Sequence, residues 1–305
     1  MTTLAVLLKS YRGDVEYARR MISSFDSFNA DDLPLYVVVP DDDVALFATM
    51  TSDNMTVLSE DVFAQHLVKE PVHGLRAGYI NQEIVKLAFA ELGLAQNYWC
   101  VDSDAEFIRP FGRADFMYDE VTPYQVLVED RDLMVEPRYF REYWQERHAT
   151  LQLIAREIGL DDRVILTCHG HQVFSSDVLR AFREDFLEPR GWTYIDALRI
   201  APYEFSWYNL WLQKSQVIPI HAREPWVKVF HHEGNHFEAI LRQVRVADLA
   251  RAYIAVVVNS NYSRDMGLLD LRASKPAALA PYLSYRELGQ LLRAKISDTW
   301  RRRRP

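Results

Sequence analysis

The stretch YWCVDSDAEFIRP, residues 98–110, joins an apolar run to two carboxylates that are separated by one residue. Residues 98–101 are typical of a short strand buried in a sheet. Asp102 and Asp104 follow at once, and another apolar piece, residues 105–111, comes after them. The two aspartates therefore lie between buried segments and not in a solvated acidic turn. We expect both carboxylates to point into one crevice where the strand ends.

Strand-like and helix-like patterns alternate before this stretch. Residues 3–8 and 34–39 predict strands, and the apolar residues between them recur at helical spacing. Residues 81–93 predict a helix that precedes the strand 98–101, and residues 163–167 predict another strand. This alternation predicts an α/β fold, a Rossmann-like α/β/α sandwich. Open α/β sheets bind ligands at the carboxyl ends of their strands, which is the position of the two aspartates.

The composition is that of a globular protein. With 305 residues, of which 49% are hydrophobic, the chain can bury a sizeable core, and its net charge of -8 disfavours nucleic acid as a partner. Cys100 and Cys168 lack C-x-x-C spacing, so we expect neither a disulfide framework nor a zinc knuckle, and a reduced cytoplasmic location. Residues 4–8 have no basic segment before them and predict a strand, not a secretory signal. The apolar run 252–258 is too short to span a bilayer.

Asp102 and Asp104 have the chemistry of a site for Mg²⁺ or Mn²⁺. These cations bind a few carboxylates and take their other ligands from phosphate and water. A D-x-D pattern alone is common in loops, and here its place after a buried strand makes it informative. The sequence has no G-x-G-x-x-G and no G-x-x-x-x-G-K, which disfavours a dinucleotide oxidoreductase and a P-loop kinase.

Two segments, GYINQEIVKL at residues 78–87 and the stretch 98–110, resemble the part of GT-A glycosyltransferases in which a helix precedes the metal-binding strand. The similarity is greatest to a bacterial group of these proteins. It implies a GT-A fold with a mixed central sheet over residues 1–240, followed by a helical C-terminal extension over residues 241–305. It also implies transfer of a sugar from a nucleoside diphosphate sugar to an acceptor hydroxyl. The end of the family's first strand meets the nucleotide, and the matching residues are Ser10, Tyr11 and Asp14.

Basic and polar side chains near the predicted helix are candidates for binding the donor. Gln82 and Lys86 are four residues apart and share one helix face. Lys86, and Arg76 before the helix, can neutralise phosphate charge; the alternative is a solvated lysine on a surface helix. Further on, His171 and Gln172 are candidates for orienting the donor or the acceptor, with a structural role as the alternative.

The resemblance also implies a late metal ligand. Many GT-A enzymes complete the metal shell with a histidine, and the H-x-x-G arrangement of the glycogenin-like group is similar to His231 and Gly234. Alternation from Val229 puts His231 on the inner side of a short strand, and imidazole suits Mn²⁺ beside carboxylates. His232 and His236 are expected to be structural.

Glu204 and Asp130 are candidates for a base that deprotonates the acceptor hydroxyl in an inverting reaction. Asp132 is a rival for this role. Glu204 lies in a segment similar to the late region of the family where an acidic residue meets the acceptor. A retaining course, in which Glu204 has no such role, stays open.

Two other functions compete with this interpretation. A zinc hydrolase would need three converging nitrogen ligands, and the sequence offers several histidines but no H-E-x-x-H: His169, His171, His231, His232 and His236. A carbohydrate-binding module would use the aromatic residues of 192–211, most of which we expect in the core.

The C-terminal tail has an apolar stripe, Leu288, Leu292, Ile296 and Trp300, flanked by Arg286, Arg293, Lys295 and the arginines 301–304. This pattern predicts either a helix that contacts an anionic membrane surface or one that packs on its own domain. The first alternative favours a lipid-linked glycan as acceptor, and a free glycan remains the other choice.

Overall fold

The computed structural model describes residues 1–50, 52–129, 131–135, 140–161, 163–167, 169–231 and 244–259, together with 235, 236, 238, 239, 242, 284–286, 288–290, 292, 293 and 296. The chain divides into two compact units. The first comprises residues 1–19, 29–103 and 111–225, and the second comprises residues 20–28, 104–110 and 226–305. The predicted boundary near residue 240 stays a prediction. Within the described ranges, no helix is long and apolar enough to cross a membrane.

The first unit is built on a five-stranded sheet with the strand order β3-β2-β1-β4-β7. The strands are β1 (Thr2–Lys9), β2 (Leu35–Val39), β3 (Met55–Ser59), β4 (Ala95–Val101) and β7 (Val173–Ser175). The first four are parallel, and β7 is antiparallel to β4. Successive residues of β1 and β4 are buried on both faces, as expected for a sheet covered on both sides. The predicted α/β fold with a mixed central sheet is confirmed.

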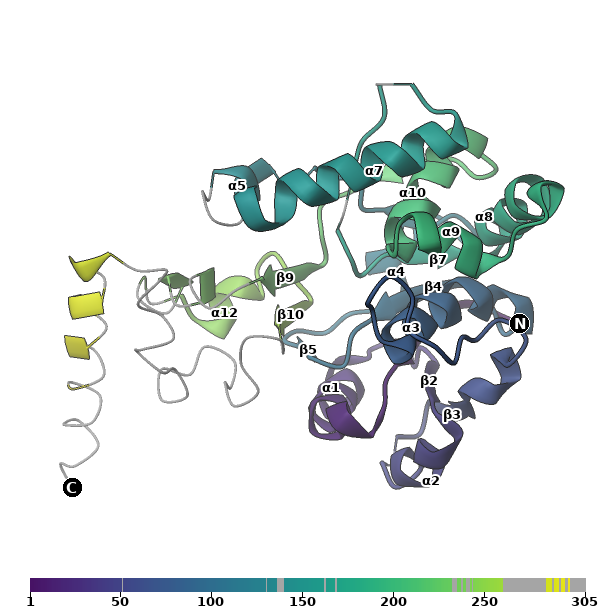
Figure 1. Ribbon diagram of the computed structural model, residues 1–305. Helices are drawn as coiled ribbons and strands as arrows, with labels where there is room; N and C mark the ends of the chain where they lie inside the picture. Colours follow the sequence, from purple (N-terminus) through teal and green to yellow (C-terminus); the bar gives the residue numbers. More distant parts are fainter. Residues whose placement is uncertain are drawn as a thin grey trace. The chain divides into compact units, whose positions relative to one another are not determined.

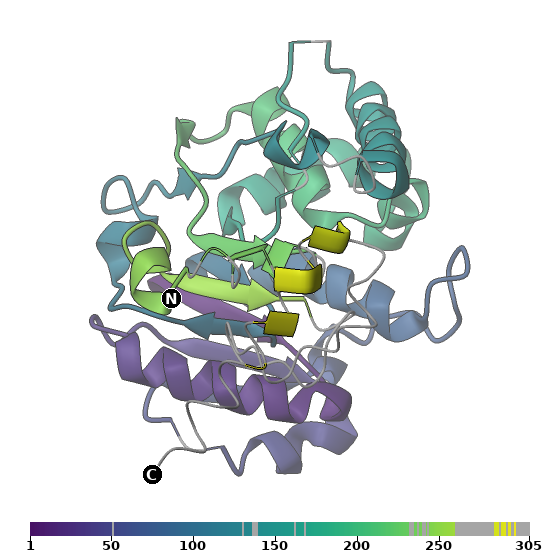
Figure 2. The ribbon, with the colours of Figure 1, turned by 90° about the vertical axis from the view of Figure 1, so that its left-hand side faces the viewer.

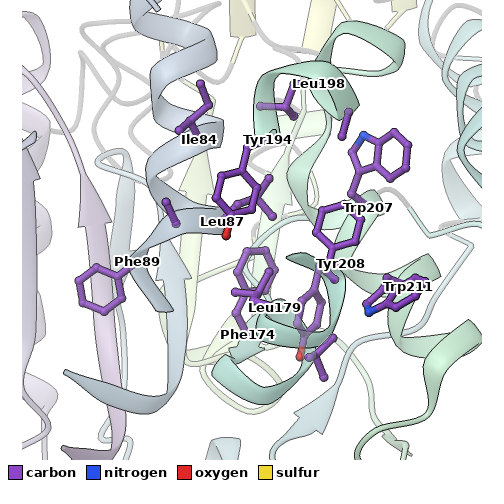
Figure 3. Packing of buried hydrophobic residues seen from close by; sticks show 14 of the residues in the cluster. Ile84, Leu87, Phe89, Phe174, Leu179, Tyr194, Leu198, Trp207, Tyr208 and Trp211 are labelled. Atoms are coloured by element: carbon purple, nitrogen blue, oxygen red, sulfur yellow. The ribbon is translucent and has the colours of Figure 1, made fainter. Parts of the chain in front are cut away.

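Five α-helices contribute to the apolar cluster on one face of this sheet: α3 (Ala77–Ala88), α7 (Gln145–Ile158), α8 (Ser176–Ala181), α9 (Tyr194–Ile200) and α10 (Glu204–Ser215). Of these, α3 contacts both α9 and α10 (Figure 1). Figure 3 shows side chains of this cluster, among them Ile84, Trp207 and Tyr208, with Phe174 of β7 stacked on Tyr208. Most aromatics of 192–211 lie in this cluster, so their predicted place in the core is confirmed. That outcome removes the main support for a carbohydrate-binding module.

The other elements of the first unit are shorter or lie at its periphery. They include α2 (Val44–Phe47), α4 (Arg113–Phe116), α5 (Arg131–Met134), a π-helix (Phe140–Trp144) before α7, a second π-helix (Phe182–Leu187) after α8, and a parallel pair of strands, β6 (Tyr124–Gln125) and β8 (His221–Ala222). The predicted helix 81–93 starts earlier, at Ala77, and its last turn is a 3-10 helix that ends at Gly93, whose φ of 63° is left-handed.

Residues 163–167, predicted as a strand, do not form one. The backbone of Ile165 is bound by a side chain instead: its N–H donates to Gln213 Oε1 over 2.9 Å, and its carbonyl accepts from Gln213 Nε2 over 3.0 Å. These hydrogen bonds satisfy the main-chain groups that a neighbouring strand would otherwise pair. The strand prediction for this segment was therefore wrong.

The second unit contains a three-stranded sheet with the order β5-β10-β9. Its strands are β5 (Ala105–Phe107), β9 (Val227–Phe230) and β10 (Ala255–Val258), and β10 is parallel to β9 and antiparallel to β5. Figure 2 shows β9 and β10 in green, next to each other. Helix α1 (Val15–Phe28) begins in the first unit and ends in this one, where Phe25 packs edge-on against Phe107. The predicted helical extension contains the strand β10 as well as the short helix α12 (Val246–Leu249).

Candidate functional site

The carboxyl ends of β1 and β4 meet in the middle of the first unit's sheet. Strands β2 and β3 lie on the far side of β1 and β7 on the far side of β4, so the strand order reverses between β1 and β4. Open α/β sheets leave a ligand-binding crevice at such a reversal. Ser10 follows β1 and Ser103 follows β4, and the Ser103 hydroxyl donates a hydrogen bond to the Ser10 hydroxyl over 2.9 Å. This bond ties the two strand ends together next to Asp102.

Lys86 of α3 is a buried cation at this strand end. Its Nζ donates to Glu204 Oε1 over 2.8 Å and to Asp102 Oδ1 over 3.3 Å, and it lies 4.7 Å from the centre of the Phe205 ring. The side chains of Lys86 and Glu204 are 4% and 5% exposed, whereas that of Asp102 is 36% exposed. The alternative of a solvated lysine is therefore wrong. Of the three charged groups, Asp102 is the one that a ligand can reach.

The sequence of α3 explains how a lysine reaches this position. Ile80, Ile84 and Leu87 face the core, and the polar residues Tyr79, Glu83 and Lys86 recur beside them at the spacing of one helix side. The Tyr98 hydroxyl of β4 donates to the Lys86 carbonyl over 2.7 Å, which anchors this end of the helix to the sheet. The polar side of α3 consequently ends beside Asp102.

Mutual attraction keeps both Lys86 and Asp102 charged. Burial by itself would lower the pKa of Lys86, but the charges of Asp102 and Glu83 outweigh it and raise that pKa above its usual value. Burial would likewise raise the pKa of Asp102, but the Lys86 ammonium and, more weakly, His171 hold it below its usual value. At neutral pH the end of β4 therefore carries an ion pair between Lys86 and Asp102. Asp102 is the partner that is partly exposed to solvent.

Glu83 is a residue of this cluster that sequence reasoning missed. Burial raises its pKa to about 7, with Lys86 opposing the shift. Its Oε2 has no hydrogen-bond partner among the described residues. With a pKa close to neutral pH, Glu83 exchanges between its charged and its protonated form at pH 7. The available signal was its place one turn before Lys86 on the same side of the helix.

His171 approaches Asp102 from the other side. Its Nε2 lies 3.7 Å from Asp102 Oδ2, and burial lowers its pKa to about 4, so the ring is neutral at pH 7. The backbone of His171 has a φ of 57°, a left-handed conformation that is strained for a residue with a side chain. Its carbonyl accepts a hydrogen bond from Trp99 Nε1 over 2.7 Å, and its Nδ1 has no partner in the described part of the chain. A buried ring on a strained backbone fits a role of His171 beside Asp102.

Gln172 is held differently. Its amide donates to the carbonyls of Val126 and His169 over 2.9 Å and 3.1 Å, and its Oε1 accepts from the Val126 N–H over 3.3 Å. The side chain is fully buried. These bonds link two loops and leave the amide occupied, which favours the structural alternative for Gln172.

Two further ion pairs lie near the ends of β1, β2 and β3. Lys9 Nζ lies 2.8 Å from Glu60 Oε2, and Asp43 accepts hydrogen bonds from the Arg12 backbone and guanidinium over 2.7 Å and 2.5 Å. Sequence reasoning assigned none of these four residues to the site. Asp43 and Glu60 each follow a parallel strand, so the strand-end rule would have singled them out once β3 was predicted.

The remaining donor-binding candidates are spread over the first unit. Tyr11 is partly exposed beyond β1, and the backbone N–H of Asp14 donates to its carbonyl over 3.0 Å in a short turn. Gln82 is half-buried on α3. Arg76 is the N-cap residue of α3, about 15 Å along the helix from Lys86, so the two cations do not act at one point.

Asp104 and His231 lie at the same end of the second unit's sheet. Asp104 immediately precedes β5 and His231 follows β9, and Ala105 and Val229 both pair with Val257 of the strand between them. Two strand spacings amount to about 10 Å, a gap that the two side chains can close on an ion. Carboxylate and imidazole are ligands that Mn²⁺ accepts, so the donor set fits the predicted metal.

Asp102 is joined to Asp104 through Ser103 alone, so their Cα atoms are within about 7 Å whatever the local conformation. Among the described residues, no three histidine, cysteine, aspartate or glutamate side chains already converge as a metal site. This finding supports neither a zinc hydrolase nor a preformed site at Asp102, Asp104 and His231, whose role as metal ligands stays a prediction. His236 is buried against Phe230, as expected for a structural residue, and burial lowers its pKa to about 4.

Several predictions fall on residues outside the described ranges. These residues are Asp130, Cys168, His232, Gly234, Lys295, Trp300 and the arginines 301–304, and the side chain of Asp132 joins them. The base role of Asp130 and the H-x-x-G arrangement stay predictions.

A protein-family model matches most of this chain. The model described as "Family of unknown function (DUF6492)" matches residues 3–254. The chain belongs to this family. The match runs from β1 to just before β10, so the DUF6492 region includes the Lys86 cluster, Asp104 and His231.

Among solved structures, the chain is similar to mouse xyloside xylosyltransferase 1 in its apo form. The two share 12% sequence identity with a TM-score of 0.48, over 85% of this chain and 98% of that chain. No curated protein sequence matches this member of the DUF6492 family.

Proposed function

We propose that this protein is a glycosyltransferase of the GT-A type that moves a sugar from a nucleoside diphosphate sugar to an acceptor hydroxyl with the help of Mn²⁺ or Mg²⁺. The observation that carries the proposal is the place of Asp102. It starts the D-x-D motif directly after β4, at the reversal of strand order, and it is the partly open member of a buried ion pair with Lys86. A D-x-D motif at that point suits a diphosphate that bridges protein and cation.

Lys86 supplies positive charge to the donor diphosphate in this proposal. The buried ammonium, held beside Asp102, stabilises through space the negative charge that develops on the leaving diphosphate, and its low-dielectric surroundings strengthen the effect. Ser10 and Ser103 line the crevice, and Tyr11 and Asp14 face the nucleoside. His171, neutral at pH 7, would orient the donor from the opposite side of Asp102.

The metal would be held by Asp104 and His231, with Asp102 as a further carboxylate. When bound, the ion would neutralise diphosphate charge as a Lewis acid. Asp130 is our candidate for the base that accepts the proton of the acceptor hydroxyl in an inverting reaction. The acceptor would be a glycan or a lipid-linked glycan.

Contact with a membrane through the tail is part of the same proposal. Leu292 and Ile296 of the predicted apolar stripe are 44% and 58% exposed. Each basic residue near an anionic surface contributes on the order of 1 kcal/mol. We expect the full chain to sediment with anionic liposomes at low salt and a chain ending at residue 284 to stay in solution. Equal sedimentation of the two would contradict membrane contact.

A thermal-shift panel tests the proposed function. Nucleoside diphosphates and their sugar conjugates are added with and without Mn²⁺ to the full chain. A ligand at one hundred times its Kd stabilises the folded state by about 2.7 kcal/mol, which is several degrees in Tm. We expect one nucleotide class to raise Tm and Mn²⁺ to enlarge the shift. If no nucleotide shifts Tm under either condition, the proposal fails.

A further inference from the structure

Glu204, predicted as a base, has a different partner in the structure. Its Oε1 accepts a hydrogen bond from Lys86 Nζ over 2.8 Å, and its side chain is 5% exposed. A base must come within about 3 Å of the acceptor hydroxyl, or reach it through one water. A buried carboxylate that is already bound to an ammonium is poorly placed for that contact.

We propose that Glu204 is a positioning residue that holds the Lys86 ammonium beside Asp102, where the charge of the ammonium acts on the donor diphosphate. This inference rests on the function proposed above. It gives Glu204 no contact with the acceptor and no proton transfer. Glu204 acts on the donor through Lys86 alone.

The backbone of Glu204 is well fixed for this role. Glu204 is the first residue of α10, and the N–H groups of Ser206 and Trp207 both donate to the carbonyl of Tyr203, each over 3.1 Å. The Trp207 indole donates to the Ala201 carbonyl over 2.9 Å and pins the start of the helix. A carboxylate in the first turn is also favoured by the helix dipole.

If the Glu204 carboxylate is removed, the Lys86 ammonium can form an ion pair with another carboxylate on its own helix. Glu83 lies one turn earlier on the same helix, and its Oε2 has no hydrogen-bond partner among the described residues. The Phe205 ring attracts the ammonium but accepts no conventional hydrogen bond from it. Glu204 therefore determines whether the ammonium stays at Asp102 or moves back along α3.

A matched pair of substitutions isolates the positioning effect. Glu204→Gln and Glu204→Leu both remove the negative charge, so any charge-driven gain in anion affinity is the same in both. Only glutamine keeps an oxygen that accepts the Lys86 hydrogen bond. Affinity for the nucleoside diphosphate that binds best among UDP, GDP, dTDP, CDP and ADP is measured by calorimetry with Mn²⁺. We expect Glu204→Leu to bind about tenfold more weakly than Glu204→Gln, the size of a hydrogen bond to a charged group.

The same pair is then compared in a Lys86→Met background, where the tenfold difference should disappear because the two residues act together. Glu91→Gln is the control for general destabilisation. Glu91 binds Tyr194 and His66 outside this cluster, so its loss should lower Tm and leave nucleotide affinity unchanged. If Lys86→Met does not fold, the NMR signal of ¹³Cε-labelled Lys86 replaces it: the signal should move in Glu204→Leu and stay in Glu204→Gln.

The outcomes of these experiments distinguish a positioning role of Glu204, which acts through Lys86, from a role that does not involve Lys86. Equal affinities of Glu204→Gln and Glu204→Leu, or a difference that persists without Lys86, would overturn the positioning role and leave the proposed function standing. An unmoved Lys86 signal in Glu204→Leu would overturn it as well. If the unsubstituted protein binds none of the nucleotides, the proposed function fails first, and the positioning role fails with it.

Discussion

Lys9 and Lys86 are both buried lysines paired with carboxylates, yet their pKa values move in opposite directions. Burial lowers the pKa of Lys9, and its contact with Glu60 does not offset this. Burial opposes the ammonium of Lys86 as well, but its pKa is raised, because the charges of Asp102 and Glu83 outweigh that burial. The comparison teaches that neighbouring carboxylates do not always outweigh burial: Glu60 and Asp43 do not do so at Lys9, whereas Asp102 and Glu83 do so at Lys86. The positive charge of Lys86 is thus more strongly stabilised than that of Lys9, which suits Lys86 to act on a diphosphate.

Substitution of Lys86 by methionine is expected to have the largest effect on stability. Glu204 would be left buried without its cation, which costs about 3–5 kcal/mol of unfolding free energy. Urea denaturation at pH 7 measures the loss. The double variant Lys86→Met/Glu204→Leu should recover much of it, since no charge is then left unpaired in the core. A single variant as stable as the original protein would break the comparison.

Glu83→Gln sharpens the comparison through its pH dependence. The pKa of Glu83 is raised from 4.5 to about 7 on folding, so stability from its protonated form is full below pH 4.5 and is lost as pH rises through 7. Glutamine stays neutral and avoids that loss. Relative to the original protein, the variant should gain up to roughly 3 kcal/mol between pH 4.5 and pH 8. Unfolding curves at pH 4.5, 6 and 8 measure the gain, and identical pH slopes would show that Glu83 is not a proton-bearing group.

Lys9→Met should cost less than Lys86→Met, about 1–2 kcal/mol at pH 7, since the Glu60 side chain it leaves behind is 17% exposed and partly hydrated. The pH dependence should also differ in sign. The lowered pKa of Lys9 means that its burial penalty is relieved as pH rises toward 10.5, so the advantage of the original protein over Lys9→Met grows. The raised pKa of Lys86 gives an advantage over Lys86→Met that is full below pH 10.5 and falls only above it. Melting curves of both variants from pH 8 to pH 11 check these signs.

The strands and helices that carry the site were largely predictable, because their patterns are local. The runs that became β1, β2 and β4 are apolar on both faces, and α3 shows a 3.6-residue period. The edge strand β3 was not predicted, since its residues Met55–Ser59 mix polar and apolar side chains. Residues 163–167 were misassigned because a glutamine side chain from far along the chain replaces a neighbouring strand there.

The side-chain partners of the site could not be predicted in the same way. Lys86 and Glu204 are 118 residues apart, and no local pattern reports that α10 places Glu204 on Lys86. The choice between a solvated and a buried Lys86 likewise depends on tertiary packing. The D-x-D motif was found because both its carboxylates lie in one short stretch beside a strand. Its chemistry therefore stays the most direct point at which to test the account.

That test is the Mn²⁺ dependence of nucleoside diphosphate binding in Asp104→Ala, with Asp53→Ala, an exposed aspartate in a loop, as the matched control. Affinity is measured by calorimetry with Mn²⁺ and with a chelator. We expect the original protein and Asp53→Ala to bind about 10–100 times more tightly with Mn²⁺, and Asp104→Ala to bind weakly and equally in both conditions, because the ion loses a charged oxygen ligand. An unchanged, Mn²⁺-enhanced affinity in Asp104→Ala would contradict the central claim.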